Sequence, residues 1–551
     1  MTTGEVDETN RSSTQANEED AQASNTVVEP EAGKVLAGQE AYDLYKQGRE
    51  AWNQWADTHA GWVVDFTDWD FSEEKEVNFS EFRFPGSAKF NKATFGNRYV
   101  SFDHASFGEG RVYFERASFG EGHVNFGGAS FGEGPVSFQG ASFGDGHVNF
   151  AETSFDGGDV AFNGARFGDG DLIFNNARFG DGGVTFWRTS FGKGVVSFQY
   201  ASFGDGFLSF ADTSFGEGHV SFMDVSFGKG GVLFQKANFG DGNVDFLCAN
   251  FGDGGVSFYG ARFGDGDVNF DRASFGDGVV YFIETNFGDG RVTFNKASFG
   301  DGVVSFEEAN FGDGDVDFFG ARFGDGDVHF DQVIFGDGDV SFRGASFPGA
   351  IVLDKARFHR VPDFRQVNFG REISLHNTEV GYQEEWYGIF LKKAVNEEAS
   401  DRLRGLRRMA AEARDHTREM DFFAKENRAK YIHELNLFQY FPIFLYDFFS
   451  DFGRSILRPV VGLLFTIFGS AWVFYDQSWK GSFWDALWLS VSNALPFVPW
   501  SRAARPDYVT ALYGQKISEL QLVNFVAYGQ SILSLIFIFL IGLALRNKLR
   551  L

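Results

Sequence analysis

The sequence predicts a mainly β fold: a long β-solenoid, followed by a helical hairpin and two transmembrane α-helices. Three observations indicate this fold class. Phe recurs every 12 residues without a slip from Phe107 to Phe347, a charged helical pattern follows this repeat, and two uncharged apolar runs lie near the C-terminus. The chain of 551 residues contains 71 Phe and 69 Gly but only 4 Met, and so strong a bias indicates a repeat rather than an ordinary globular domain.

The N-terminal segment is polar, acidic and without periodicity. It reads MTTGEVDETNRSSTQANEEDAQASNTVVEPEAG and lacks the basic and apolar regions of a secretory signal. We therefore expect residues 1–35 to be a disordered acidic tail. Apolar residues at helical spacing follow in QEAYDLYKQGREAWNQWADTHAG. They predict a helix over residues 36–61 that caps the open end of the solenoid.

The repeat unit reads F-G-D-G-x-V-x-F-x-x-A-x. Each V-x-F and A-x-F triplet places its first and third side chains on one face of a short strand. Because so short a strand cannot bury its face alone, successive units are expected to stack through backbone ladders over residues 62–380. The predicted solenoid core is illustrated by Val268, Phe270, Ala273 and Phe275.

A Gly-acid-Gly triplet follows the Phe in 17 of the 20 units. We expect a tight corner in which the glycines take positive φ and the acid bonds its own backbone. Stacked corners would align these acids in a ladder of like charges. A ladder that binds calcium through oxygen ligands is the alternative, although the known calcium-binding nonapeptide has a different spacing; no other cofactor is expected.

The five-residue step F-x-x-A-x-F resembles the pentapeptide-repeat family, whose units carry a small residue and, two positions later, a large central Leu or Phe. That family forms a right-handed four-sided β-helix with four units per coil. The resemblance therefore implies a 24-residue coil made of two 12-residue repeats, with two corners enlarged by the Gly-acid-Gly insertion. A flattened coil of one 12-residue repeat stays open as the alternative.

After residue 380 the repeat stops, and charged residues, Ala and Leu predominate. The sequence EEASDRLRGLRRMAAEARDHTREMDFFAKENRAKYIHEL has apolar residues at helical spacing on both sides of Asp415 and His416. Residues 381–438 are therefore predicted to form a charged helical hairpin. Its Arg and Glu side chains are interpreted as solvent-exposed faces, with docking to a partner or to the solenoid as the alternative.

Residues 439–551 are predicted to form a membrane domain. The aromatic-rich segment 439–457 suits the membrane boundary. Two uncharged apolar runs are long enough to cross the hydrocarbon core, one over residues 456–476 and the other over residues 523–545.

Basic residues at the ends of the two runs predict their orientation. Arg454 and Arg458 precede the first run, and Arg546, Lys548 and Arg550 follow the second. Because basic residues accumulate on the cytoplasmic side of a membrane, we expect both termini and the solenoid in the cytoplasm. The single cysteine agrees with a reducing compartment.

Between the two runs lies GSFWDALWLSVSNALPFVPW, which is apolar but too short to cross a membrane. Residues 482–498 are predicted to form a re-entrant or interfacial helix. Two spans with a short re-entrant helix between them resemble the plan of two-helix ion channels, but the glycine-containing filter of potassium channels is missing, so potassium selectivity is not expected. The residues predicted nearest a pore are Ser490, Ser492, Asn493, Pro496 and, on the second span, Gln530.

The whole arrangement, which ends in LALRNKLRL, resembles bacterial membrane pentapeptide-repeat proteins with a channel-like C-terminal domain. The resemblance covers nearly the whole chain. It implies a multi-pass protein of the bacterial inner (cytoplasmic) membrane, and it implies no reaction.

The composition disfavours several function classes. A net charge of -28 disfavours nucleic-acid binding, which requires basic side chains. The 10 His are scattered and no nucleophile, metal or phosphate-loop constellation stands out, so we expect no enzyme and no catalytic, cofactor-binding or metal site. The leading hypothesis is an oligomeric channel-like or pore protein whose cytoplasmic rod senses or binds an unknown protein. The alternatives are a membrane-tethered scaffold without conduction and an acidic DNA-mimic binding protein.

Overall fold

The computed structural model divides into two compact units, residues 1–185 (the first unit) and residues 186–551 (the second unit). The described residues are 34–387, 391–394, 396–433, 437–479, 481–495, 497–514 and 521–549. The predicted acidic tail, residues 1–35, lies outside the described residues except for Lys34 and Val35. Val35 begins the first strand.

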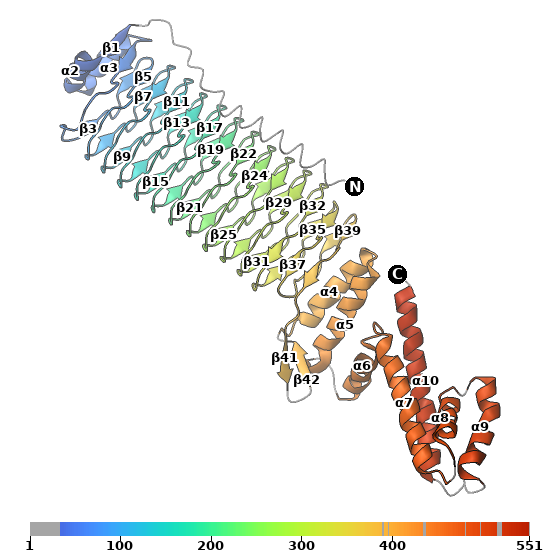
Figure 1. The fold of residues 1–551 in the computed structure, drawn as a ribbon. Coiled ribbons are helices and arrows are strands. Elements are labelled where there is room, and N and C mark those ends of the chain that lie inside the picture. The colour runs from blue at the N-terminus through green and yellow to red at the C-terminus, as the bar shows by residue number, and fades with distance from the viewer. Residues whose placement is uncertain are drawn as a thin grey trace. The chain divides into compact units, whose positions relative to one another are not determined.

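The predicted fold class is confirmed, because the repeat forms a parallel-sheet β-solenoid of about 14 turns and helices follow it (Figure 1). Strands of the regular repeat pair with the strand 24 residues on, as Val136 does with Val160 in the first unit and Val256 does with Val280 in the second. A complete coil therefore holds two repeats. This register excludes the flattened one-repeat coil, in which each strand would pair with the next repeat.

Short strands of two types alternate around each coil, one starting at the Val of V-x-F and the other ending at the Phe of A-x-F. In the first unit, the strands of one Val face are β1 (Val35–Ala37), β2 (Val63–Asp65), β5 (Ala88–Lys89), β8 (Val112–Tyr113), β11 (Val136–Ser137), β14 (Val160–Ala161) and β17 (Val184–Thr185). The strands of the other Val face are β3 (Val77–Asn78), β6 (Val100–Ser101), β9 (Val124–Asn125), β12 (Val148–Asn149) and β15 (Leu172–Ile173). The strands of the third face are β4 (Arg83–Phe84), β7 (Ser106–Phe107), β10 (Ser130–Phe131), β13 (Ser154–Phe155) and β16 (Arg178–Phe179). Isolated bridges, such as the one between Ser118 and Ser142, form the fourth face.

The second unit repeats the same four faces. The strands of one Val face are β20 (Leu208–Ser209), β22 (Val232–Leu233), β24 (Val256–Ser257), β27 (Val280–Tyr281), β30 (Val304–Ser305), β32 (Val328–His329), β36 (Ile351–Val352) and β39 (Ile373–Ser374). The strands of the other Val face are β18 (Val196–Ser197), β21 (Val220–Ser221), β23 (Val244–Asp245), β25 (Val268–Asn269), β28 (Val292–Thr293), β31 (Val316–Asp317) and β34 (Val340–Ser341). The strands of the A-x-F faces are β19 (Ser202–Phe203), β26 (Ser274–Phe275), β29 (Ser298–Phe299), β33 (Ile334–Phe335), β35 (Ser346–Phe347), β37 (Arg357–Phe358), β38 (Asn368–Phe369) and β40 (Glu379–Val380).

Phe side chains fill the inside of each coil. Phe270 stacks on Phe294 with ring centroids 4.8 Å apart, and it meets Phe282 edge to face at 5.5 Å. The stacking distance matches the spacing of strands in a sheet, and the edge-to-face contact sets a positive ring edge against a negative ring face. The four residues predicted for the core are buried: Val268, Phe270, Ala273 and Phe275.

The Gly-acid-Gly corners differ from the sequence expectation. Among the described repeats the second glycine never has positive φ, and the first glycine has it in only some units, such as Gly240 at 66°. Close stacking requires these glycines instead: a Cβ on Gly266 would lie 2.3 Å from the carbonyl oxygen of Gly242, one coil earlier. No side chain fits there, because successive corners touch backbone to backbone.

Positive φ occurs instead in the turn between Phe and Ala of F-x-x-A. Cys248 lies there with φ 57°, and the N–H of Ala249 closes the turn on the carbonyl oxygen of Phe246 at 3.0 Å. Gly260 occupies the same position of the following repeat with φ 62°. A left-handed φ costs a non-glycine residue roughly 1–2 kcal/mol, so the stacked coils hold these turns against their local preference.

The corner acids bond the next coil rather than their own backbone. The N–H of Asp313 donates to Asp289 at 3.0 Å, and the N–H of Asp337 donates to Asp313 at 3.0 Å. In the first unit, the N–H of Asp169 donates to Asp145 at 3.0 Å. These hydrogen bonds to a charged acceptor offset the repulsion between like charges along the ladder. Calcium binding to the ladder stays a prediction.

Two short helices, α2 (Gly38–Lys46) and α3 (Arg49–Thr58), cover the N-terminal end of the first unit. The sequence predicts one helix here; Gly48, with φ 93°, separates the two. The indole of Trp52 is buried among the first Phe rings and donates to the carbonyl oxygen of Arg83 at 2.8 Å. The helices therefore shield the apolar end of the solenoid.

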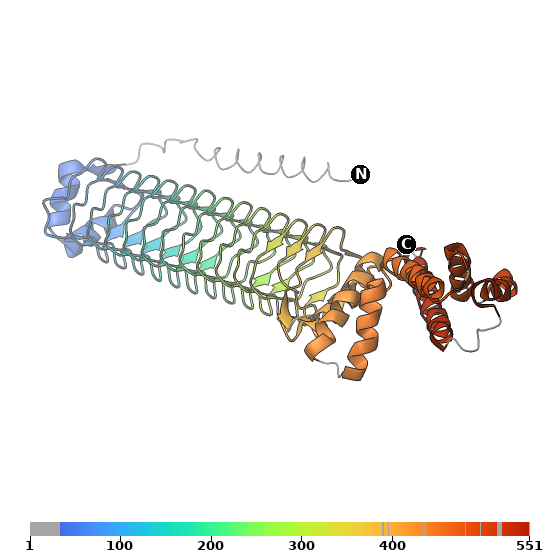
Figure 2. The same cartoon turned by 60° about the horizontal axis from the view of Figure 1, so that its bottom comes forward.

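A helical hairpin follows the solenoid in the second unit. Its helices are α4 (Ala399–Glu412) and α5 (His416–His433), and a two-stranded antiparallel sheet of β41 (Glu384–Tyr387) and β42 (Leu391–Ala394) precedes it. In both views α4 lies against the last coils (Figure 1, Figure 2), and it contacts β39.

Buried charges join the hairpin to the solenoid. The side chain of Arg402 is 9% exposed and pairs at 2.9 Å with Asp339, which follows the last Gly-acid-Gly corner. Lys425 donates to the carbonyl oxygen of Val380 at 3.1 Å. The interpretation of the hairpin charges as solvent-exposed faces is therefore wrong at Arg402, where the alternative of docking to the solenoid holds.

The C-terminal part consists of helices with short connections. They are α6 (Leu437–Ser450), α7 (Leu457–Asp476), α8 (Phe483–Ala494), α9 (Pro499–Tyr513) and α10 (Gln521–Leu549). Both α7 and α10 are long and apolar enough to cross a membrane. They lie where the sequence predicts spans, over residues 456–476 and 523–545. The helix α6 overlaps the predicted boundary segment 439–457, α8 overlaps the predicted helix 482–498, and α9 is a helix that the sequence reading did not include.

Candidate functional site

The short helix α8 lies between the two candidate spans. Ser482 starts it through a reciprocal cap, in which its Oγ accepts from the N–H of Asp485 and the carboxylate of Asp485 accepts from the N–H of Ser482, both at 3.2 Å. The helix then packs against both α7 and α10. This arrangement carries the polar residues of α8 into an apolar environment.

Ser490 and Gln530 meet inside the contact of these three helices. Ser490 is 0% exposed and Gln530 is 3% exposed. The Nε2 of Gln530 donates to the Oγ of Ser490 at 2.7 Å and to its carbonyl oxygen at 2.9 Å. The Oγ of Ser490 donates to the carbonyl oxygen of Ile467 at 2.6 Å. One pair of side chains therefore links α7, α8 and α10.

The other predicted pore residues are buried or lie outside the described residues. Ser492 donates to the carbonyl oxygen of Leu489 at 2.7 Å, within α8. The carbonyl oxygen of Asn493 accepts from Ser531 of α10 at 3.1 Å, and the Asn493 side chain is 2% exposed. Pro496 lies outside the described residues. The predicted pore residues that the structure describes all face the interior of the chain.

Several polar atoms of this cluster have no hydrogen-bond partner among the described residues. They are the Nδ2 and Oδ1 of Asn493, the Oε1 of Gln530 and the Oγ of Ser534. A buried polar group without a partner costs roughly 1–3 kcal/mol. The cluster therefore has unused capacity for water or another polar ligand.

Sequence reasoning missed two members of the cluster, Ser531 and Ser534. Ser534 lies one helical turn beyond Gln530, and Ser531 lies one residue beyond it, so helical spacing from Gln530 could have found Ser534. It also missed the contact of Tyr513, whose hydroxyl donates to the carbonyl oxygen of Phe474 at 2.7 Å. No pattern marked Tyr513, because its helix was not predicted.

The chemistry of the cluster is neutral. Its side chains are hydroxyls and carboxamides, which exchange hydrogen bonds but carry no charge and transfer no proton near neutral pH. Such groups inside membrane helices hold helices together or line a polar path. The cluster is suited to helix packing, to water or to a weakly bound ion, and not to acid–base catalysis.

The outer faces of α7 and α10 are apolar and exposed. They include Phe465 and Phe468 on α7 and Phe525, which is 78% exposed, on α10. Exposed Trp472 lies near the end of α7 and exposed Trp479 lies just beyond it, as aromatic residues do at a membrane boundary. Lipid or another copy of the chain can cover these faces.

Ion pairs connect the hairpin to the start of α7. Arg428 of α5 pairs with Asp447 at 2.7 Å and with Asp451 at 2.5 Å, and Arg454 pairs with Asp451 at 2.9 Å and with Asp421 at 2.7 Å. Burial acts to raise the pKa of Asp451, but its hydrogen bonds with Arg454 and Arg428 prevail and lower that pKa. Asp451 therefore stays charged near neutral pH.

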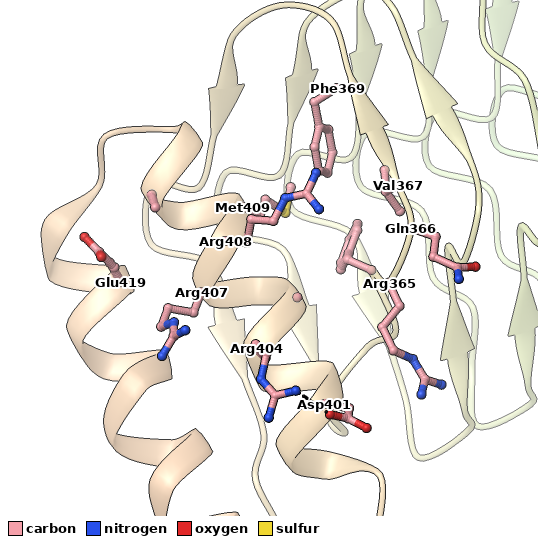
Figure 3. Close-up of a pocket in the computed structure, with 13 residues that line it drawn as sticks. Arg365, Gln366, Val367, Phe369, Asp401, Arg404, Arg407, Arg408, Met409 and Glu419 are labelled. Atoms are coloured by element: carbon pink, nitrogen blue, oxygen red, sulfur yellow. Dashed lines mark hydrogen bonds and ion pairs between the residues drawn. The ribbon is translucent and has the colours of Figure 1, made fainter.

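A cleft of about 580 Å³ opens between α4 and the last coils (Figure 3). Its cationic residues include Arg404, Arg407 and Arg408. Carboxylates already hold them, since Arg404 pairs with Asp401 at 2.9 Å and Arg408 pairs with Glu412 at 3.0 Å. The cleft is consequently a weaker candidate for an anionic partner than its Arg content alone indicates.

Comparison of the chain with protein-family profiles, with curated proteins and with solved structures finds no match.

Proposed function

We propose that this chain is a membrane-anchored solenoid protein whose C-terminal helices assemble into a channel-like oligomer. In this proposal α7 and α10 span a bacterial inner membrane, and the solenoid is a cytoplasmic rod that binds a protein partner. The protein is not an enzyme and uses no cofactor. The F-x-x-A-x-F step, which resembles pentapeptide repeats, supports the bacterial source.

The position of α8 is the observation that carries the proposal. An anchor requires only the two spans, whereas this chain adds a short helix that packs against both and buries Ser490, Asn493 and Gln530 in the contact. Polar side chains inside a membrane are costly and are commonly functional. The order of a span, a short helix and a second span therefore supports an ion-conducting pore. The exposed apolar faces of α7 and α10 supply the surface on which copies of the chain assemble.

A continuous set of contacts supports regulation by the solenoid. Arg402 of α4 holds Asp339 of the solenoid, α4 packs on α5, and Arg428 of α5 holds Asp447 and Asp451 next to α7. These ion pairs join packed helices. A displacement of the last coil therefore also displaces the start of the first span.

The basic ends of the spans support a cytoplasmic solenoid. Arg454 precedes α7 and Arg458 lies in its first turn, while Arg546 and Lys548 lie in the last turn of α10. Asn547 donates to the carbonyl oxygen of Gly453 at 3.3 Å. The basic ends of both helices therefore meet, as the positive-inside rule requires of two spans that share a cytoplasmic side.

A membrane-tethered scaffold without conduction is the second candidate. It is favoured by the bond between Gln530 and Ser490, because these two buried side chains pair within one chain and do not point towards a neighbouring copy.

Ion flux through liposomes that contain the purified full-length protein tests the two candidates. We expect flux from the unchanged protein, altered several-fold by Asn493→Leu, which removes the unpartnered amide. Gln521→Leu is the matched control, because it removes an exposed carboxamide at the start of α10, outside the cluster, and we expect it to leave the flux unchanged. An inserted oligomer, verified by native mass spectrometry, that passes no ions would leave the scaffold as the function.

A further inference from the structure

A second cavity lies at the end of α10, where the apolar run of that helix gives way to basic residues. Its volume is about 440 Å³, within the range of small-ligand pockets. Its wall is built from the hairpin, α6 and the last turns of α10 and consists of Arg407, His416, Glu419, Met420, Phe423, Tyr446, Leu543, Arg546 and Asn547.

The wall combines an apolar side with hydrogen-bond donors. Met420, Phe423 and Leu543 form the apolar side, and the donors include the hydroxyl of Tyr446 and the amide of Asn547. These two donors come close together, because a Cβ built on Gly453 would lie 2.8 Å from the Tyr446 hydroxyl and 2.9 Å from the Asn547 Nδ2. A ligand in the cavity can therefore accept hydrogen bonds from Tyr446 and Asn547 and can pack an apolar part against the apolar side.

The charges of the wall leave one cation without a carboxylate partner. His416 lies 3.1 Å from Glu419, and Arg407 pairs with Glu426 at 2.8 Å while lying over the Phe423 ring. Arg546, in contrast, donates to the amide oxygen of Asn547 at 3.4 Å, and no carboxylate of the described residues lies within ion-pair distance of it.

A guanidinium beside hydroxyl and amide donors matches the chemistry of phosphate oxygens. We propose that this cavity binds the phosphate group of an anionic lipid at the membrane boundary. The apolar outer face of α10, with exposed Leu545 and Phe539, leads towards the cavity and accommodates the acyl chains. Basic residues next to a membrane span attract the anionic lipids of that membrane surface.

This inference requires that α10 spans the membrane, and it does not require conduction. A bound lipid would contact the hairpin, α6 and α10 together. It would therefore stabilise the packing of these helices between the solenoid and the spans. An absence of ion flux would not contradict lipid binding in this cavity. An absence of lipid binding would likewise not contradict ion conduction.

The test measures the thermal unfolding of the full-length protein in detergent while short-chain lipid is added. We expect dioctanoyl phosphatidylglycerol to raise the unfolding temperature with saturation, and dioctanoyl phosphatidylcholine to leave it unchanged. Arg546→Gln should weaken the apparent affinity for phosphatidylglycerol about tenfold, the size expected from one charge-assisted hydrogen bond. Tyr446→Phe, which removes only the hydroxyl, should weaken it less.

Lys548→Gln is the matched control, because Lys548 is an exposed cation in the same last turn that does not line the cavity. Equal loss of affinity in Arg546→Gln and Lys548→Gln would overturn the site in favour of diffuse attraction to a basic helix end. A third arm adds inorganic phosphate alone. Saturation by phosphate at the concentration that suffices for phosphatidylglycerol would overturn a lipid ligand in favour of a soluble anion.

Discussion

The solenoid and the contact of α7, α8 and α10 differ in how they pair their polar groups. In the solenoid, the N–H of Asp313 bonds the carboxylate of Asp289 one coil earlier, and the same pairing recurs at the next coil between Asp337 and Asp313. In the helical contact, Gln530 finds Ser490, but the amide of Asn493 and the hydroxyl of Ser534 find no partner among the described residues. Repetition therefore lets one pairing recur from coil to coil, whereas a helix contact formed once must satisfy each group separately.

The largest expected effect is a cavity in the Phe interior of the solenoid. Phe270→Ala removes a ring that stacks and meets neighbours edge to face, and we expect a loss of about 3–5 kcal/mol in the free energy of unfolding. Chemical denaturation of the full-length protein measures it. Tyr259→Ala is the control, because Tyr259 is an exposed aromatic residue in the same part of the repeat. A similar loss in both variants would contradict a core that depends on buried rings.

Backbone stacking at the corners is tested by adding a methyl group. Gly266→Ala places a Cβ 2.3 Å from the Gly242 carbonyl oxygen, and overpacking of this kind costs about 1–3 kcal/mol. Gly231→Ala is the matched control, because the nearest atom to its Cβ lies 3.5 Å away. The same denaturation experiment compares the two, and equal stability would show that the corners separate readily.

The unpartnered amide of α8 gives a prediction of opposite sign. Asn493→Leu keeps the approximate size and removes the buried polar atoms, so we expect a stability gain of about 1–3 kcal/mol. Ser490→Ala, which breaks the bond with Gln530, should lower stability instead. Thermal unfolding in detergent measures both. A loss of stability in Asn493→Leu would mean that water or another copy of the chain satisfies this amide.

Placing glycine in a left-handed turn of the solenoid should give a smaller gain in stability. Cys248→Gly places glycine at φ 57° and should add about 1 kcal/mol, because glycine adopts this φ without a Cβ clash. Gly260→Ala at the same turn position should lose about as much. Denaturation again measures the difference, and the same sign in both variants would contradict the assignment of strain to φ.

The smallest effect concerns pH at the docked end of the solenoid. Burial opposes ionisation of Asp363, yet hydrogen bonds from Arg365 prevail and lower its pKa below the usual 3.8. A lowered pKa stabilises the fold at pH values above 3.8, and this contribution disappears as the pH falls through the lower folded-state value. The difference in unfolding temperature between the unchanged protein and Asp363→Asn should therefore be larger at pH 6 than at pH 3. The same difference in unfolding temperature at both pH values would contradict a stabilising role of the ionised Asp363.

The candidate site was only partly predictable. The apolar run around Gln530 and the polar residues Ser490 and Asn493 stand out in the sequence, because polar side chains are rare in such runs. The direction in which these side chains point cannot be predicted from the sequence, because the packing of the three helices decides whether a residue faces a neighbouring helix, lipid or a pore. Arg402 is a similar case: its charge indicates solvent, and the neighbouring Asp339 and Glu398 make its burial tolerable.

The sequence by itself determined the solenoid, the helical hairpin and the two apolar helices. A period of 12 residues, alternation of apolar side chains and long uncharged runs are local properties that packing cannot reverse. Only the tertiary structure decided that two repeats form one coil, that the corner glycines serve backbone contact, and that Arg546 lacks a carboxylate partner among the described residues. The physical reason is that these properties depend on which residues meet across a coil or between helices, and distances of that kind are absent from local spacing.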